Sequence, residues 1–95
     1  MFAVVVRYIQ PIEQVDAVLA PHRAYLQSHC DAGRFVMAGR QVPRTGGLIL
    51  AQAESKEELR KLLAEDPFHK AGVAEYDIIE YVPTVFAPGF AVFVR

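Results

Sequence analysis

Residues 2–9 of the chain read Phe2-Ala3-Val4-Val5-Val6-Arg7-Tyr8-Ile9. Successive side chains of an extended strand point to opposite faces, so Val4 and Val6 share one face while Val5 lies on the other. Both alternating sets are apolar, which is typical of a strand that is covered on both sides. The segment therefore predicts a central strand with helices on one face and another layer, such as a second subunit, on the other.

A helical pattern follows Pro11. Apolar and aromatic side chains recur at three- and four-residue steps through residues 12–29, which is the spacing of a helix that buries one face. Pro21 interrupts this pattern, because proline lacks the amide donor and clashes with the preceding turn. Two interpretations remain open: one helix kinked at Pro21, or a short helix followed by a second one that starts near Pro21. Gly33 is expected to end the element.

Two further strands are expected over residues 34–40 and 48–53. The connection at residues 43–47 is rich in turn-forming residues, so the two strands are predicted to form a hairpin. Ser55 and Glu58 have the spacing of a capping box, in which each side chain satisfies the other's free amide. A second long helix is therefore expected to begin there.

A short helix is expected over residues 66–71, because Asp66 before Pro67 is a favourable helix start and Gly72 a favourable end. Residues 76–82 have the composition of a fourth strand. The predicted order is β-α-β-β-α-β. This order indicates the α+β class: a ferredoxin-like sandwich with a four-stranded antiparallel sheet.

The 95 residues are expected to form a single domain, residues 1–95. A domain of this size hides only about 60–65% of the surface of its unfolded chain. Yet 53% of the residues are hydrophobic, so a homodimer or higher homo-oligomer is expected. The tail, residues 84–95, is more apolar than a loose end should be and is predicted to pack on its own or a neighbouring subunit.

The charge balance, the cysteine content and the absent motifs limit the partners, the cellular location and the cofactors that are expected. Ten Lys and Arg against eleven Asp and Glu give a net charge of −1, which argues against nucleic acid and anionic membranes as partners. Cys30 is the single cysteine and no signal pattern is present, so the cytoplasm is the expected location. Nucleotide-binding and metal-binding motifs are absent, and neither a cofactor nor a metal is expected.

His22 and Asp66 are the candidate catalytic residues. His22 is either a hydrogen-bonded histidine at the edge of a buried face or a general acid or base, because imidazole exchanges protons near neutral pH. Asp66 caps its helix with one oxygen, which leaves the other free to accept an imidazole N–H. This pairing is favoured over a local one between His69 and Asp66. Arg40 and Arg44 bracket the hairpin turn as candidates to hold an anionic substrate.

Several features follow one another in a characteristic order along nearly the whole chain: His22 ahead of Tyr25-Leu26, Gly33 before an apolar strand, Ala38-Gly39, Pro43-Arg44-Thr45-Gly46-Gly47, Asp66-Pro67-Phe68, Ala71-Gly72 and Glu80-Tyr81. In this order and spacing the chain resembles the YCII-related family of small dimeric α/β-barrel proteins. The resemblance implies a ferredoxin-like fold whose sheets pair face to face across a dimer. It also implies a pocket with a histidine–aspartate pair, which maps onto His22 and Asp66.

The resemblance also bears on activity. The family is generally treated as enzymatic, some relatives dehydrochlorinate chlorinated aromatic intermediates, and the wider superfamily includes muconolactone isomerases. Relatives often carry Ser-Gly-Pro where this chain has Ala38-Gly39-Arg40, so Arg40 is expected to change the charge of the pocket. Arg40, Arg44 and Phe68 are the residues assigned here to substrate binding.

Three functions are considered. The favoured function is a cofactor-independent enzyme that performs elimination, isomerisation or hydrolysis on a small organic substrate, such as a cyclic or chloroaromatic compound. In this enzyme His22 transfers the proton, and Asp66 fixes the tautomer of the His22 ring. The alternative is a non-catalytic small-molecule-binding or sensory module. The third is a structural oligomer in which the pair only holds helices together.

Overall fold

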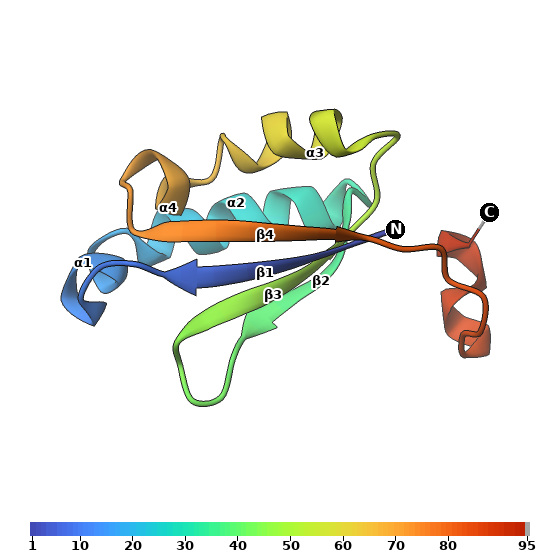
Figure 1. Cartoon of the computed structure of the whole chain (residues 1–95), viewed down its shortest axis with the longest axis horizontal. Coiled ribbons are helices and arrows are strands. Elements are labelled where there is room, and N and C mark those ends of the chain that lie inside the picture. The colour runs from blue at the N-terminus through green and yellow to red at the C-terminus, as the bar shows by residue number, and fades with distance from the viewer. Residues whose placement is uncertain (95) are drawn as a thin grey trace.

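The computed structural model describes residues 1–94. The elements follow one another as β1 (Phe2–Tyr8), α1 (Ile12–Ala17), α2 (Leu19–Asp31), β2 (Phe35–Arg40), β3 (Gly46–Ala51), α3 (Lys56–Leu63), α4 (Pro67–Lys70), β4 (Ala74–Glu80) and a 3₁₀ helix η1 (Pro88–Phe93). The four strands form one sheet in the order β2-β3-β1-β4, and every neighbouring pair is antiparallel. This arrangement, with the main helices on one face of the sheet (Figure 1), confirms the predicted ferredoxin-like α+β fold.

Strand β1 lies at the centre of the sheet, as its sequence predicts. Val4 sits opposite Ile49 on β3 and Ile78 on β4. Phe2, Val4 and their neighbours on the helix side form the core, and Val4 is completely buried. This face is closed by α2, α3 and α4, so the first of the two predicted covers is present.

The opposite face of the sheet carries no cover within residues 1–94. Val5 on this face pairs with Leu48, and Leu50 pairs with Met37. Met37, Leu48 and Ile79 are 47%, 46% and 54% exposed. The face is therefore apolar and open to solvent in the single chain.

The helical segment before β2 consists of two helices. Helix α1 ends at Ala17, Val18 has non-helical backbone angles, and α2 begins at Leu19. Pro21 lies in the first turn of α2, where backbone amides have no partner in the helix and a missing donor costs nothing. The two-helix interpretation is therefore confirmed and the kink is wrong. Gly33 follows the end of α2 with a φ of +78°, as expected for a helix terminator.

The second strand of the hairpin begins earlier than predicted. Strand β3 begins at Gly46 rather than at Leu48, and the two glycines read as turn residues are part of the strand. The reason is the close approach of β1, because a Cβ added at Gly46 would overlap the carbonyl oxygen of Val6. Strand β4 also begins two residues earlier than predicted, at Ala74. The cap of α3 is confirmed, since the Ser55 hydroxyl accepts from the Glu58 amide at 3.2 Å.

The tail projects beyond the end of the sheet at which the N-terminus lies (Figure 1). No side chain of η1 is fully buried, and Val85 and Val92 are 92% and 72% exposed. Packing of residues 84–95 on their own or a neighbouring subunit stays a prediction, and Arg95 lies outside the described residues.

We expect Gly46→Ala to lower the free energy of unfolding by about 1–3 kcal/mol, because the new Cβ forces β3 away from β1. Gly39→Ala is the matched control in the neighbouring strand, since an added Cβ there meets nothing within 4 Å. Urea unfolding at neutral pH measures both variants. Equal midpoints would contradict the close approach.

Candidate active site

Asp66 precedes α4 and caps this helix. Its Oδ1 accepts a hydrogen bond from the backbone amide of Phe68 at 2.9 Å, and Pro67 occupies the first helical position. The exposed fraction of Asp66 is 0%. A buried carboxylate is tolerated only where hydrogen bonds replace the water that it has lost. Asp66 therefore needs further donors.

Two side chains from other elements supply those donors. Nδ1 of His22 on α2 lies 2.7 Å from Oδ1 of Asp66, across 44 positions of sequence. The hydroxyl of Tyr76 on β4 donates to Oδ2 at 2.7 Å. The predicted contact between His22 and Asp66 is thus present. The predicted use of the two oxygens is wrong, because Oδ1 accepts from both the Phe68 amide and His22, while Oδ2 is occupied by Tyr76. The local alternative is wrong, because within residues 1–94 His69 forms no hydrogen bond with Asp66.

Tyr76 is the member of this network that the sequence prediction missed. Burial, followed by the hydrogen bond to Asp66 and its negative charge, raises the pKa of Tyr76 far above its usual range. The phenol therefore stays protonated and remains a donor at any physiological pH. The inward alternation of β4 places Tyr76 on the helix side, but only the strand register brings its hydroxyl to Asp66.

His22 is held in one orientation by two contacts. A carboxylate only accepts hydrogen bonds, so Nδ1 is the donor and Nε2 of the neutral ring carries the free lone pair. The imidazole stacks on Phe68, with centroids 3.6 Å apart and planes within 3°. Tyr8 packs edge-on against Phe68 at 5.9 Å. The side chain of His22 is 11% exposed, which leaves it a small opening toward a cavity.

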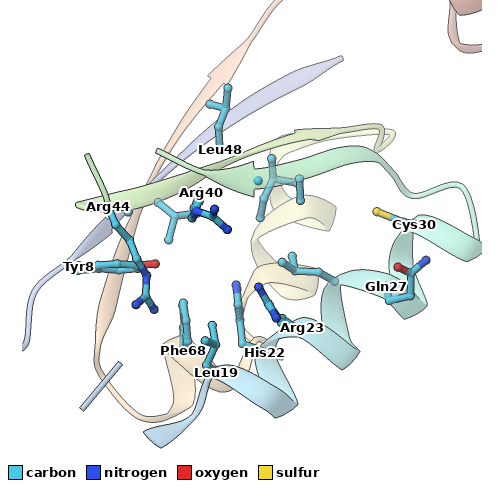
Figure 2. A pocket seen from close by; sticks show the side chains of 17 residues that line it. Tyr8, Leu19, His22, Arg23, Gln27, Cys30, Arg40, Arg44, Leu48 and Phe68 are labelled. Atoms are coloured by element: carbon cyan, nitrogen blue, oxygen red, sulfur yellow. The ribbon is translucent and has the colours of Figure 1, made fainter. Parts of the chain in front are cut away.

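That cavity lies between α2 and the hairpin of β2 and β3 and has a volume of about 600 Å³. Figure 2 shows His22 and Arg23 entering it from α2, with Arg40 reaching in from the opposite side. Its lining includes the apolar side chains of Val6, Leu19, Leu26, Ile49 and Phe68. The volume is in the range of small-molecule sites, and apolar walls with a few polar groups are their usual composition.

The arginines of the cavity differ in their partners. Arg44 donates to Asp16 at 2.7 Å, and its guanidinium lies 5.7 Å from the centre of the Tyr8 ring. The hydrogen bond to Asp16 raises the pKa of Arg44. Arg40 and Arg23 form no ion pair with any side chain in the described part of the chain. The structure therefore brings Arg40, Arg44 and Phe68 to one cavity with His22, while their role in binding stays a prediction.

Two further titratable groups, His29 and Cys30 in α2, have pKa values shifted toward their neutral forms. His29 accepts a hydrogen bond from Arg34 at 2.8 Å, and burial together with this arginine lowers the pKa of His29. Cys30 lines the cavity, and burial followed by the charge of Asp31 raises the pKa of its thiol. Among residues 1–94, no three His, Cys, Asp or Glu side chains are grouped as metal ligands would be.

The chain belongs to the YCII-related family, whose domain model matches residues 1–82. Nine chains of known structure match it. One is 5-chloro-2-hydroxyhydroquinone dehydrochlorinase from Burkholderia phenoliruptrix AC1100, solved with 2,5-dihydroxybenzoquinone. It superimposes with a TM-score of 0.68 at 22% identity, over 85% of this chain and 93% of the other. This similarity shows a shared fold. No protein with a curated description matches the chain.

We expect Tyr76→Phe to lower the free energy of unfolding by about 1–3 kcal/mol, because it leaves Oδ2 of the buried Asp66 without its donor. Tyr81→Phe is the control, since Tyr81 is 38% exposed and its hydroxyl forms no hydrogen bond within residues 1–94. Urea unfolding at pH 7 compares the two. If both variants unfold like the parent chain, the hydrogen bond to Asp66 contributes nothing.

Proposed function

We propose that this chain is a cofactor-independent enzyme that performs acid–base chemistry on a small organic substrate. The observation that carries the proposal is the orientation of His22, whose Nδ1 contacts Asp66 while the ring lines the cavity and points a nitrogen into it (Figure 2). A histidine with one nitrogen fixed and the other free is suited to accept a proton from a bound molecule. A cyclic substrate, including a chloroaromatic one, suits a cavity of about 600 Å³ with largely apolar walls.

In an elimination or an isomerisation, the proposed reaction starts when Nε2 of His22 takes a proton from a carbon or a hydroxyl of the substrate, and the electron pair of the broken bond forms a new double bond. In the elimination, a leaving group such as chloride then departs with its bonding pair, and in the isomerisation the imidazolium returns the proton to another carbon. In a hydrolysis, Nε2 instead takes the proton from water as the water oxygen bonds to the carbonyl carbon, and the imidazolium gives this proton to the leaving oxygen as its bond to that carbon breaks. In each case the negative charge of Asp66 stabilises the imidazolium.

The structural relative supports this choice of chemistry. It is a dehydrochlorinase, solved in complex with a small dihydroxyquinone. Elimination of chloride from a ring is one of the reactions open to His22. At 22% identity the substrate itself does not transfer, so we propose the reaction class alone.

A non-catalytic binding or sensory module is the second candidate. The cavity and its arginines favour it, because both are suited to retain a small anion without chemistry. The opening of the His22 side chain toward the cavity argues against the third possibility, a pair that only joins helices. Turnover separates the first candidate from the second.

We expect small cyclic lactones or chlorinated hydroxyaromatics to be turned over, and His22→Ala to lower kcat at least about 100-fold. Asp66→Asn should slow turnover as well and lower the free energy of unfolding by about 1–3 kcal/mol, because the amide caps α4 but carries no charge. His69→Ala, on the same short helix and without a contact to Asp66, should retain full activity. Full activity in folded His22→Ala would refute the mechanism. Saturable binding without turnover would favour the sensory module.

We also propose that the chain acts as a homodimer through the open face of its sheet, with residues 84–95 packed on the partner. Exposed apolar patches of this kind mark interaction surfaces. The single cysteine, Cys30, is compatible with a reducing compartment, and we propose the cytoplasm. Among the described residues, no helix is both long enough and apolar enough to cross a membrane.

Sedimentation at micromolar concentration tests the dimer. We expect the parent chain to sediment as a dimer and Ile79→Lys as a monomer, because the charge would be buried in the interface. Ile12→Lys, on α1 and 39% exposed, should remain dimeric. A monomeric parent chain would refute the dimer and leave the fold unaffected.

A further inference from the structure

We propose that Arg23 and Arg40 form an anion-binding subsite opposite His22, and that the substrate is a planar ring with an ionised oxygen. This proposal rests on the proposed function, since the subsite would hold the molecule from which His22 takes its proton. The ionised oxygen is that of a carboxylate, an enolate or a phenolate.

The two arginines reach the cavity from separate elements. Arg23 follows His22 in the first turns of α2, and Arg40 is the last residue of β2. Figure 2 shows the side chain of Arg40 facing those of His22 and Arg23 across the open space. An oxygen placed between the two guanidinium groups would therefore lie close to the imidazole.

The positive charge of this subsite has no counterpart in the protein. No carboxylate lines the cavity within the described part of the chain. The nearest buried one, Asp66, is occupied by its three donors. Arg44 is already paired with Asp16. Guanidinium groups held in one cavity without anions repel one another, and a bound anion removes this repulsion.

The remaining walls of the cavity favour a flat ligand. Arg40 lies opposite Gly47 in the hairpin, and Gly47, paired with the buried Val6, is on the helix side of the sheet and lines the cavity. With no side chain at Gly47, a ring can lie against this part of the hairpin while its edge meets the arginines. The opposite wall is apolar, with Leu19 and Leu26 on α2.

The two arginines would also stabilise the negative charge that forms on the substrate during the proposed reaction. Removal of a proton by a neutral base leaves negative charge on the substrate. Two guanidinium groups beside that charge stabilise it electrostatically, and such stabilisation is usually a large part of catalysis. Planar guanidinium groups also pair with carboxylates and enolates through two hydrogen bonds, so they orient the ring.

The experiment compares benzoate with benzamide, which have the same shape and differ in charge. We expect benzoate to bind at least about tenfold more tightly, corresponding to about 1.4 kcal/mol, as measured by NMR shift titration at low salt. In Arg23→Gln and Arg40→Gln the preference should fall toward unity. Both arginines are exposed, so these variants are expected to fold. Arg40→Lys, which keeps the charge but not the planar group, should retain part of the preference.

Arg34→Gln is the matched control, because Arg34 is exposed and bonded to His29 outside the cavity. It should leave the preference unchanged. Equal binding of benzoate and benzamide to the parent chain, or a preference that survives in both glutamine variants, would overturn the subsite. Neither result tests the proposed role of His22 in proton transfer. Conversely, a preference for benzoate in a chain without turnover would retain the subsite and reject only the enzyme.

Discussion

The buried carboxylate of Asp66 is the constraint on which the rest of the site depends. A charge with no exposed surface destabilises the folded chain by several kcal/mol unless its lost water is replaced. Three donors replace it: the Phe68 amide in α4, His22 in α2 and Tyr76 in β4. These donors come from three different elements, so their positions around one carboxylate are fixed together. The orientation of His22 is thus part of what makes the fold stable.

The four-residue helix α4 could not hold this arrangement alone, because helices of one turn are unstable without tertiary contacts. Phe68 supplies those contacts, since it is 1% exposed and packs against both Tyr8 and His22. The same ring that anchors α4 in the core is therefore the surface on which the imidazole lies flat. Stability and the proposed function use the same contacts here, and a substitution at Phe68 would disturb both.

Local sequence patterns predicted most of the elements. The alternation of residues 2–9, the Ser55 cap and the Asp66-Pro67 start each act within a few residues, and they predicted the strand and the two helix starts correctly. The capping box at Ser55 is only half formed among the described residues, because the Ser55 hydroxyl accepts from the Glu58 amide but Glu58 does not return the bond. The contact between His22 and Asp66 was also anticipated. Tyr76 was missed because its hydroxyl reaches Asp66 only through the register of β4. The glycines at 46–47 were misread because turns and close strand contacts both require glycine, and only the position of Val6 distinguishes them.

The distribution of charge is compatible with the proposed selection of an anionic ligand by a nearly neutral chain. Its ten basic residues almost balance its eleven acidic ones, so the molecule as a whole has little attraction for polyanions such as nucleic acid. Three of the ten, Arg23, Arg40 and Arg44, nevertheless line one cavity. Some basic side chains elsewhere are paired with carboxylates, as Arg7 is with Asp77 on the open sheet face. A concave site with apolar walls concentrates the field of its own charges. The field therefore acts on a molecule small enough to enter the cavity, and a large anion outside experiences only the balanced surface.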